Sequence, residues 1–274
     1  MALLGIALAA AVLLVWAVSG RRGALARRPE LYRCRYAHRG LHDAAAGVPE
    51  NSLPAFRRAA AAGFGAELDV HLTRDGRLAV FHDSRLERIC GAAGTLEERT
   101  AAELSALRLC GTGERIPMLE EVLPLFAGGL PLLIEMKPRN WRDCAPLAEA
   151  LARALAEHRG PFCVQSFHPW AMRCFRRQMP GCIRGQLARD FRKDREVHPA
   201  GAFLLSHLLL NWLSRPDFVA SRFEDRRTWG LRLCRRLGLR EFSWTITDAA
   251  AMTEAEADGA TPIFEGFSPR EPLA

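Results

Sequence analysis

Short apolar runs alternate with helix-like segments along most of this sequence, and this alternation restricts its fold more than any other feature. Apolar runs of about four to eight residues predict buried strands, whereas apolar residues at i, i+4 and i+8 predict one face of a helix. Strands that alternate with helices are typical of a parallel sheet covered by helices. The strand candidates are 33–37, 65–70, 78–81, 131–135, 162–165, 182–187, 217–220, 241–246 and 261–265, and the helix candidates include 51–62, 144–158, 226–237 and 248–257.

A turn signal separates two of the strand candidates. Thr73-Arg74-Asp75-Gly76 lies between 65–70 and 78–81 and is typical of a hairpin, so we expect 78–81 to pair antiparallel with its predecessor. Eight strands then remain for a parallel arrangement. Because the 274 residues leave room for one barrel of about 250 residues, we predict an α/β fold, a (β/α)8 TIM barrel. A doubly wound open sheet is the alternative.

Two segments between the strands carry weaker signals. Segment 83–117 has several glycines and little strand character, and we expect it to leave the barrel as a short insertion near the active-site end. Segment 204–213 is strongly apolar but is too short to span a membrane. We therefore expect it to form one buried helix of the barrel.

The N-terminal segment 2–18 is an uninterrupted apolar run at the lower edge of the about 17–25 residues that cross a bilayer. Positive charge follows the run, which favours keeping that flank in the cytoplasm. We therefore predict a hydrophobic membrane anchor at 1–20, a basic linker at 21–32 and a barrel domain at 33–274 on the cytoplasmic side. The alternative is a signal peptide cleaved near the small residues 17–19, which gives a secreted or cell-surface protein.

The net charge of +7 bears on binding partners through the positions of the basic residues along the sequence. The first 30 residues carry +3 of it, and the remaining basic residues are scattered among acidic ones rather than gathered in one stripe. This pattern argues against nucleic-acid binding. The eight cysteines form no C-x-x-C motif and no zinc-like spacing, so we expect reduced thiols.

Two strand candidates each carry an acidic residue followed, two positions later, by another charged residue. Glu67 and Asp69 lie in 65–70 and point to the same side of the strand. If that side is buried, the two carboxylates repel each other and need a partner, for which a hard divalent cation is the simplest choice; an outward-facing pair in solvent is the alternative. Glu135 and Lys137 repeat the spacing, either as an internal ion pair or as a third oxygen ligand beside a contact for an anion.

Other polar residues follow the strand candidates at the end where a barrel keeps its active site. They are His38 with Arg39, His82, Gln165 and Trp244, each of which has a structural alternative. Three carboxylates, two histidines and two cations at strand ends together indicate metal-assisted chemistry at phosphorus. In such a site the cation and the basic side chains neutralise phosphate oxygens, while the histidines move protons.

Eight short motifs occur in one order between about residues 36 and 269. They are His38-Arg39-Gly40, Pro49-Glu50-Asn51-Ser52, Glu67-Leu68-Asp69-Val70, Thr73-Arg74-Asp75-Gly76, Phe81-His82-Asp83, Ile116-Pro117-Met118-Leu119-Glu120-Glu121-Val122, Ile134-Glu135-Met136-Lys137 and Gln165-Ser166-Phe167. This ordered set resembles the glycerophosphodiester phosphodiesterase family. The resemblance implies a (β/α)8 barrel that hydrolyses glycerophosphodiesters to glycerol 3-phosphate and an alcohol with Mg²⁺ or Ca²⁺.

The resemblance also implies a role for each matching residue. It implies that His38 and His82 are the catalytic histidines and that Glu67, Asp69 and Glu135 bind the metal. It also implies that Arg39 and Lys137 contact the phosphate. Glu50 would be an acid by the metal site, and Trp244 would lie beside the substrate. Gln165 is a further candidate. Two positions depart from the family, namely His168, where Asp is frequent, and Glu265, where Asp is common. We assigned neither to the chemistry, so they bear on substrate preference.

Two alternatives differ from hydrolysis of a soluble diester. One is a phosphodiesterase for lysophospholipids or other lipid headgroups, which an anchor would hold at its substrate's surface. The other is an inactive barrel that binds phosphate-bearing ligands, which predicts a missing metal ligand or histidine, whereas all are present. The alcohol, the choice of Mg²⁺ or Ca²⁺, direct water attack or a cyclic phosphate route, and the oligomeric state stay open.

Overall fold

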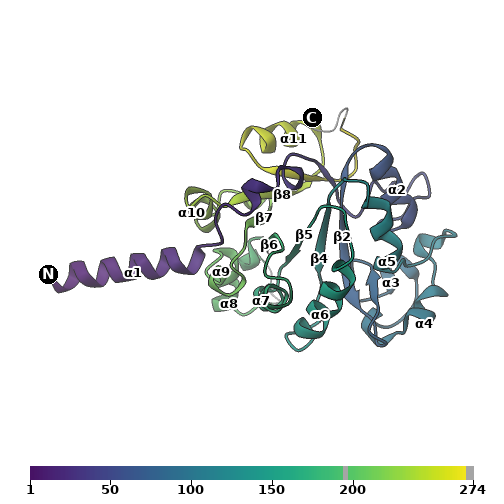
Figure 1. Cartoon of the computed structure of the whole chain (residues 1–274), viewed down its shortest axis with the longest axis horizontal. Helices are drawn as coiled ribbons and strands as arrows, with labels where there is room; N and C mark the ends of the chain where they lie inside the picture. Colours follow the sequence, from purple (N-terminus) through teal and green to yellow (C-terminus); the bar gives the residue numbers. More distant parts are fainter. Residues whose placement is uncertain (194–196, 270–274) are drawn as a thin grey trace.

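A computed structural model describes residues 1–193 and 197–269, and its centre is a closed barrel (Figure 1). Within the described residues, eight parallel strands follow one another around the barrel, and β1 pairs with both β9 and β2 to close it. The predicted TIM barrel is therefore confirmed, and the open sheet is excluded. The strands are β1 (Tyr36–Ala37), β2 (Gly65–Leu72), β4 (Leu132–Met136), β5 (Phe162–Ser166), β6 (Arg184–Ala188), β7 (Phe218–Arg222), β8 (Arg240–Ile246) and β9 (Thr261–Phe264).

The helices that cover the barrel form where the sequence has apolar faces and caps. In α6 (Cys144–Leu155), Leu147, Leu151 and Leu155 are buried against the sheet. The Asp248 carboxylate accepts a hydrogen bond from the backbone of Ala251 and so caps the following helix, as predicted. The other covering helices are α2 (Leu53–Ala61), α5 (Leu119–Val122), α7 (Pro169–Gln178), α10 (Trp229–Arg236) and α11 (Ala249–Ala257).

The insertion follows the hairpin strand β3 (Leu78–Val80), which pairs antiparallel with β2 as predicted. It contains the short helices α3 (Glu87–Cys90) and α4 (Ala101–Ser105) and lies on the side of the barrel away from the N-terminal helix (Figure 1). The insertion has its own apolar cluster, which includes Leu86 and Leu104. This small core holds the segment in place beside the carboxyl end of β2.

The prediction of one buried helix at 204–213 is wrong. The chain forms two short helices, α8 (Pro199–Ser206) and α9 (Asn211–Ser214), and Leu208 between them has a φ of 59°. A right-handed helix cannot continue through a left-handed residue, so the segment turns there. Phe203 and Leu204 on α8 are exposed rather than buried.

The apolar N-terminal run forms α1 (Ala2–Val18), which projects from the barrel (Figure 1). Its 17 residues extend over about 26 Å, which is less than the ~30 Å hydrocarbon core of a bilayer. Among residues 1–193 and 197–269, no helix combines the length and the apolar character needed to cross a membrane. This finding overturns our prediction of a membrane-spanning anchor, and the localisation that we derived from it falls with it.

The residues that follow α1 are attached to the barrel. The Arg21 guanidinium donates two hydrogen bonds, of 2.6 and 2.8 Å, to the buried carboxylate of Asp217 at the start of β7. Leu25 and Leu31 are buried against the aromatic interior of the barrel, and the Tyr36 hydroxyl donates to the Leu31 carbonyl oxygen. These contacts close the end of the barrel opposite to the polar strand ends.

Candidate active site

Three buried carboxylates meet at the carboxyl ends of β2 and β4. Glu67 and Asp69 point to the interior from β2. Glu135 on β4 lies directly opposite Asp69 in the register of the two strands. One oxygen atom from each lies within 4.8 Å of the others, and the three residues are 2%, 1% and 7% exposed. The spacing of two residues in each strand thus places the acids on the inside, and the solvent-exposed alternative is excluded.

Lys137 partly compensates the negative charge of this acidic cluster. Its Nζ atom lies 3.2 Å from Oδ1 of Asp69 and 3.1 Å from Oε1 of Glu135. Burial opposes ionisation of Asp69, but the ammonium group of Lys137 lowers the pKa of Asp69 below its ordinary value. Burial raises the pKa of Glu135 to about 7 despite Lys137, and burial and the neighbouring acids raise the pKa of Glu67 well above its ordinary value. One ammonium group therefore does not balance three carboxylates.

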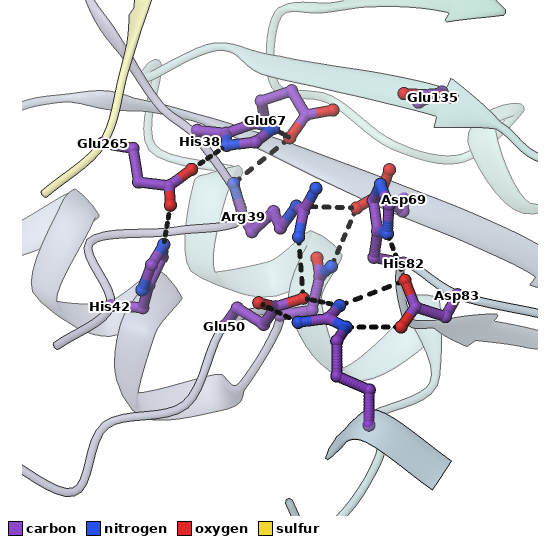
Figure 2. A network of polar contacts seen from close by, with 12 residues as sticks. His38, Arg39, His42, Glu50, Glu67, Asp69, His82, Asp83, Glu135 and Glu265 are labelled. Carbon is purple, nitrogen blue, oxygen red and sulfur yellow. Dashed lines mark hydrogen bonds and ion pairs between the residues drawn. The ribbon is translucent and has the colours of Figure 1, made fainter. Parts of the chain in front are cut away.

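Arg39 approaches the acidic cluster from the loop after β1. Its backbone is left-handed, with a φ of 55°, and its backbone N–H donates to Oε2 of Glu67 at 3.2 Å. The guanidinium Nη1 donates to Oε1 of Glu50 at 2.9 Å, and Nε lies 3.8 Å from Oδ2 of Asp69. Figure 2 shows Arg39 between these acids. Glu50 thus holds Arg39, and it is not one of the three clustered acids.

His38 lies beside the acidic cluster and is held from behind by Glu265. Its Nδ1 atom hydrogen-bonds Oε2 of Glu265, and its Nε2 atom lies 4.0 Å from Oε2 of Glu67. His42 approaches the second oxygen of Glu265 at 3.8 Å (Figure 2). The hydrogen bond from His38 lowers the pKa of Glu265 to about 2, so this residue is a carboxylate at neutral pH. The sequence-based prediction of the site does not include Glu265.

His82 is held in the same way from the insertion side. Its Nδ1 atom lies 2.5 Å from Oδ1 of Asp83. Arg88 in α3 binds Asp83 and also Glu50, with hydrogen bonds of 2.5 to 3.1 Å. Burial lowers the pKa of His82 to about 4. The insertion therefore connects the loop that carries His82 to the loop that carries Arg39.

Asn51 is another residue of the site that sequence reasoning missed. Its side chain is 1% exposed, and its Nδ2 atom donates to Oδ2 of Asp69 at 2.9 Å. Its backbone is left-handed, with a φ of 53°, and its buried Oδ1 atom has no hydrogen-bond partner. Its place in the motif Pro49-Glu50-Asn51-Ser52 was the signal that could have revealed it.

A cavity of about 100 Å³ opens at this constellation. Gln165 and Trp244 line it, and the Trp244 indole N–H donates to the Ala220 carbonyl oxygen at 3.2 Å. The Oε1 atom of Gln165 is buried without a partner. His168 lies outside this cavity, in the wall of a larger one nearby. The cavity itself is lined by His38, Arg39, Glu67, His82, Glu135, Lys137, Gln165, Phe167, Leu187, Trp244, Thr245 and Ile263.

The structure therefore brings together nearly all of the residues predicted from the sequence. Asp69 and Glu50 are the two that do not line the cavity, but both contact Arg39, which does. One cavity thus brings together a cluster of buried carboxylates, two cationic side chains and two imidazole rings. This combination suits hydrolysis of a phosphodiester. The comparison with known proteins agrees, since residues 38–267 match the glycerophosphoryl diester phosphodiesterase family. The chain belongs to this family of phosphoric diester hydrolases.

Individual relatives extend this result. A glycerophosphodiester phosphodiesterase of Caldanaerobacter subterraneus is 30% identical over 240 residues, which cover 81% of this chain and 90% of that protein. One from Bacillus altitudinis is 36% identical over 155 residues, which cover 53% of this chain and 62% of that protein, less than two thirds of its length. Among solved structures, an Oleispira antarctica phosphodiesterase in complex with sn-glycerol-3-phosphate has a TM-score of 0.71 at 23% identity and covers 89% of this chain and 95% of that one. This last similarity shows the fold.

Proposed function

We propose that this chain hydrolyses glycerophosphodiesters to glycerol 3-phosphate and an alcohol, that the reaction requires a divalent cation, and that His38 and His82 are its general acid and base. The observation that carries the proposal is the meeting of three buried carboxylates, two cations and both histidines at one cavity. The family membership supports the same substrate class, and so does the Caldanaerobacter relative, of which the alignment covers 90%.

The residues present fit a hard divalent cation. Glu67, Asp69 and Glu135 offer oxygen atoms within 4.8 Å of one another, and the buried Oδ1 of Asn51 has no partner. Buried carboxylates repel one another unless a cation lies between them, and Mg²⁺ and Ca²⁺ both prefer oxygen ligands. When bound, such a cation polarises phosphoryl oxygens and stabilises the negative charge of the transition state.

Arg39 and Lys137 are placed to bind the phosphodiester. Both side chains are largely buried, line the cavity and are held by carboxylates, Arg39 by Glu50 and Lys137 by Asp69 and Glu135. Because these carboxylates fix the positions of the guanidinium and ammonium groups, the two side chains need to move little when a phosphate enters. Arg39 offers several N–H donors, whereas Lys137 acts as a compact positive charge.

The two histidines are placed to move protons. Glu265 and Asp83 each bind the Nδ1 atom of one ring, which favours the tautomer that carries its proton there and leaves Nε2 toward the cavity. Because the pKa of His82 is about 4, its ring is neutral at pH 7 and has a free lone pair on Nε2. A positioned acid–base group of this kind accelerates proton transfer by about 10²- to 10⁴-fold.

The test is the release of glycerol 3-phosphate from glycerophosphocholine or the related methyl diester by the full-length chain. We expect turnover with Mg²⁺ or Ca²⁺ and a loss of about 10²-fold or more in His38→Ala and His82→Ala. His158→Ala is the matched control, because His158 precedes β5 at the opposite end of the barrel and does not line the cavity. No turnover of either diester by the unmodified chain, or full turnover by His38→Ala, would contradict the proposal. Either result would favour the inactive barrel or a mechanism without these histidines.

A further inference from the structure

A second and much larger cavity lies beside the catalytic one. Its volume is about 590 Å³, and it shares His82, Glu135, Lys137 and Phe167 with the catalytic cavity. The catalytic cavity of about 100 Å³ is too small for more than part of a phosphodiester, whereas volumes of about 300–1,000 Å³ are typical of sites that enclose a ligand. The larger cavity therefore continues directly from the position at which the phosphorus would react.

The far wall of this larger cavity is apolar. Pro138 and Pro169 contribute from the loops after β4 and β5, and Phe191, Leu205 and Leu210 contribute from the segment between β6 and β7. Phe167 joins the two cavities, because its ring packs edge-on against Trp244 on one side and against Phe191 on the other, with centroid separations of 5.6 and 5.9 Å. A continuous aromatic and aliphatic surface thus leads away from the catalytic centre.

Polar side chains in the rest of the cavity lining are already engaged. His71 lies 2.8 Å from a carboxylate oxygen of Glu97, and Ser84 donates to the same carboxylate at 2.7 Å. Arg139 lies 3.2 Å from Glu98. Among the described residues that line the cavity, the one acid is Glu135, which is paired with Lys137.

These neighbours disfavour a cationic alcohol. A choline or ethanolamine group would lie close to the charges of Lys137 and Arg139 and would find no free carboxylate in the described part of the wall. An uncharged alkyl chain, in contrast, gains from leaving water for this surface.

We propose that this cavity binds the leaving alcohol of the diester and that it selects an uncharged alcohol with an alkyl chain. This inference rests on the proposed phosphodiesterase function and specifies its substrate. Each methylene that enters the cavity should raise kcat/KM by about fourfold until the apolar wall is covered. The proposal thus predicts a preference that glycerophosphocholine, with its cationic alcohol, does not satisfy.

The experiment compares glycerophosphodiesters of methanol, butanol and octanol with glycerophosphocholine, using the full-length chain and a divalent cation. We expect kcat/KM to increase from methyl to octyl and to be at least tenfold higher for the butyl diester than for glycerophosphocholine. No increase with chain length, or a preference for glycerophosphocholine, would overturn the leaving-alcohol assignment while hydrolysis of the methyl diester upheld the proposed function. If no diester is hydrolysed, the proposed function is overturned and this inference with it.

Variants on α8 locate the effect. Leu205 lines the cavity, whereas its neighbour Leu204 is exposed and does not. Leu205→Asp should lower the octyl-to-methyl ratio of kcat/KM at least tenfold, and Leu204→Asp should leave that ratio unchanged. Gly201→Leu is a second cavity variant, which adds a side chain to the cavity lining. The residue has room for it, because a Cβ atom there meets no atom closer than Val197 Cγ1 at 3.4 Å. An unchanged ratio in both folded cavity variants would contradict the assignment.

Discussion

The Nδ1 atom of His82 lies 2.5 Å from Oδ1 of Asp83, so the histidine and the acid that follows it in sequence form one unit. Arg88 binds the same carboxylate through Nε and Nη2, at 2.5 and 3.1 Å. The Arg88 hydrogen bond overcomes the effect of burial and lowers the pKa of Asp83 to about 2, so the acid stays ionised. An ionised Asp83 can fix the ring orientation and stabilise the imidazolium form of His82 when a proton arrives.

We predict that Asp83→Asn lowers kcat by about 10- to 100-fold, which is less than the full contribution of an acid–base group. The amide keeps the shape of the side chain but no longer stabilises a protonated ring, so KM should change little. Steady-state kinetics across pH 5 to 9 would measure this, with the exposed Asp258→Asn as the matched control. If both variants retain the kcat and the pH profile of the unmodified chain, Asp83 does not position His82.

Lys137→Met should destabilise the chain in the absence of divalent cations. The substitution removes the ammonium group that lies within 3.2 Å of both Asp69 and Glu135, and it leaves buried carboxylates without that partner. Loss of one member of a buried ion pair lowers the free energy of unfolding by about 3 kcal/mol or more. Denaturant unfolding measures the loss, and addition of Mg²⁺ or Ca²⁺ should recover part of it.

The other lysine of the sequence supplies the control for that experiment. Lys193 is 55% exposed and binds Asp225, which Arg222 also contacts. Lys193→Met should therefore lower the free energy of unfolding by less than about 1 kcal/mol. Equal losses in the two lysine variants would show that the acidic cluster does not need the Lys137 charge.

Stabilisation by a divalent cation should increase from pH 6 to pH 8. Burial raises the pKa of Glu135 from 4.5 to about 7, so between these values the cation-free folded chain binds more protons than the unfolded chain and loses stability as pH rises. A cation needs the ionised carboxylate, and its binding is therefore stronger above pH 7. Thermal unfolding with and without Mg²⁺ or Ca²⁺ at pH 6, 7 and 8 measures the effect. A gain in Tm that does not vary with pH would contradict it.

The barrel and the centre of the site could be predicted because both depend on local patterns. Residues two apart in a strand share a face, so Glu67 with Asp69, and Glu135 with Lys137, could be placed together as soon as their strands were recognised. The parallel order of β2 and β4 then brought the two pairs into contact. The chemistry of the site is thus encoded in short segments whose geometry is regular.

Other features depend on contacts that no local pattern shows. Glu265 lies 227 positions from its partner His38, and Asn51 reaches Asp69 from a left-handed turn. At 204–213 the apolar composition predicted one helix, but the left-handed residue Leu208 divides it. For the N-terminal run, composition at the limit of a membrane span led us to an anchor, whereas the helix that forms is shorter than a bilayer core.

The most direct test of the central claim is a metal titration of the full-length chain after removal of divalent cations with a chelator. Glycerol 3-phosphate release should be absent in the cation-free protein and should return in a saturable manner with Mg²⁺ or Ca²⁺. A Glu67→Gln, Glu135→Gln double variant removes two of the three clustered carboxylates and should show no return. Full turnover in excess chelator, or full recovery by the double variant, would contradict the metal-dependent phosphodiesterase that we propose.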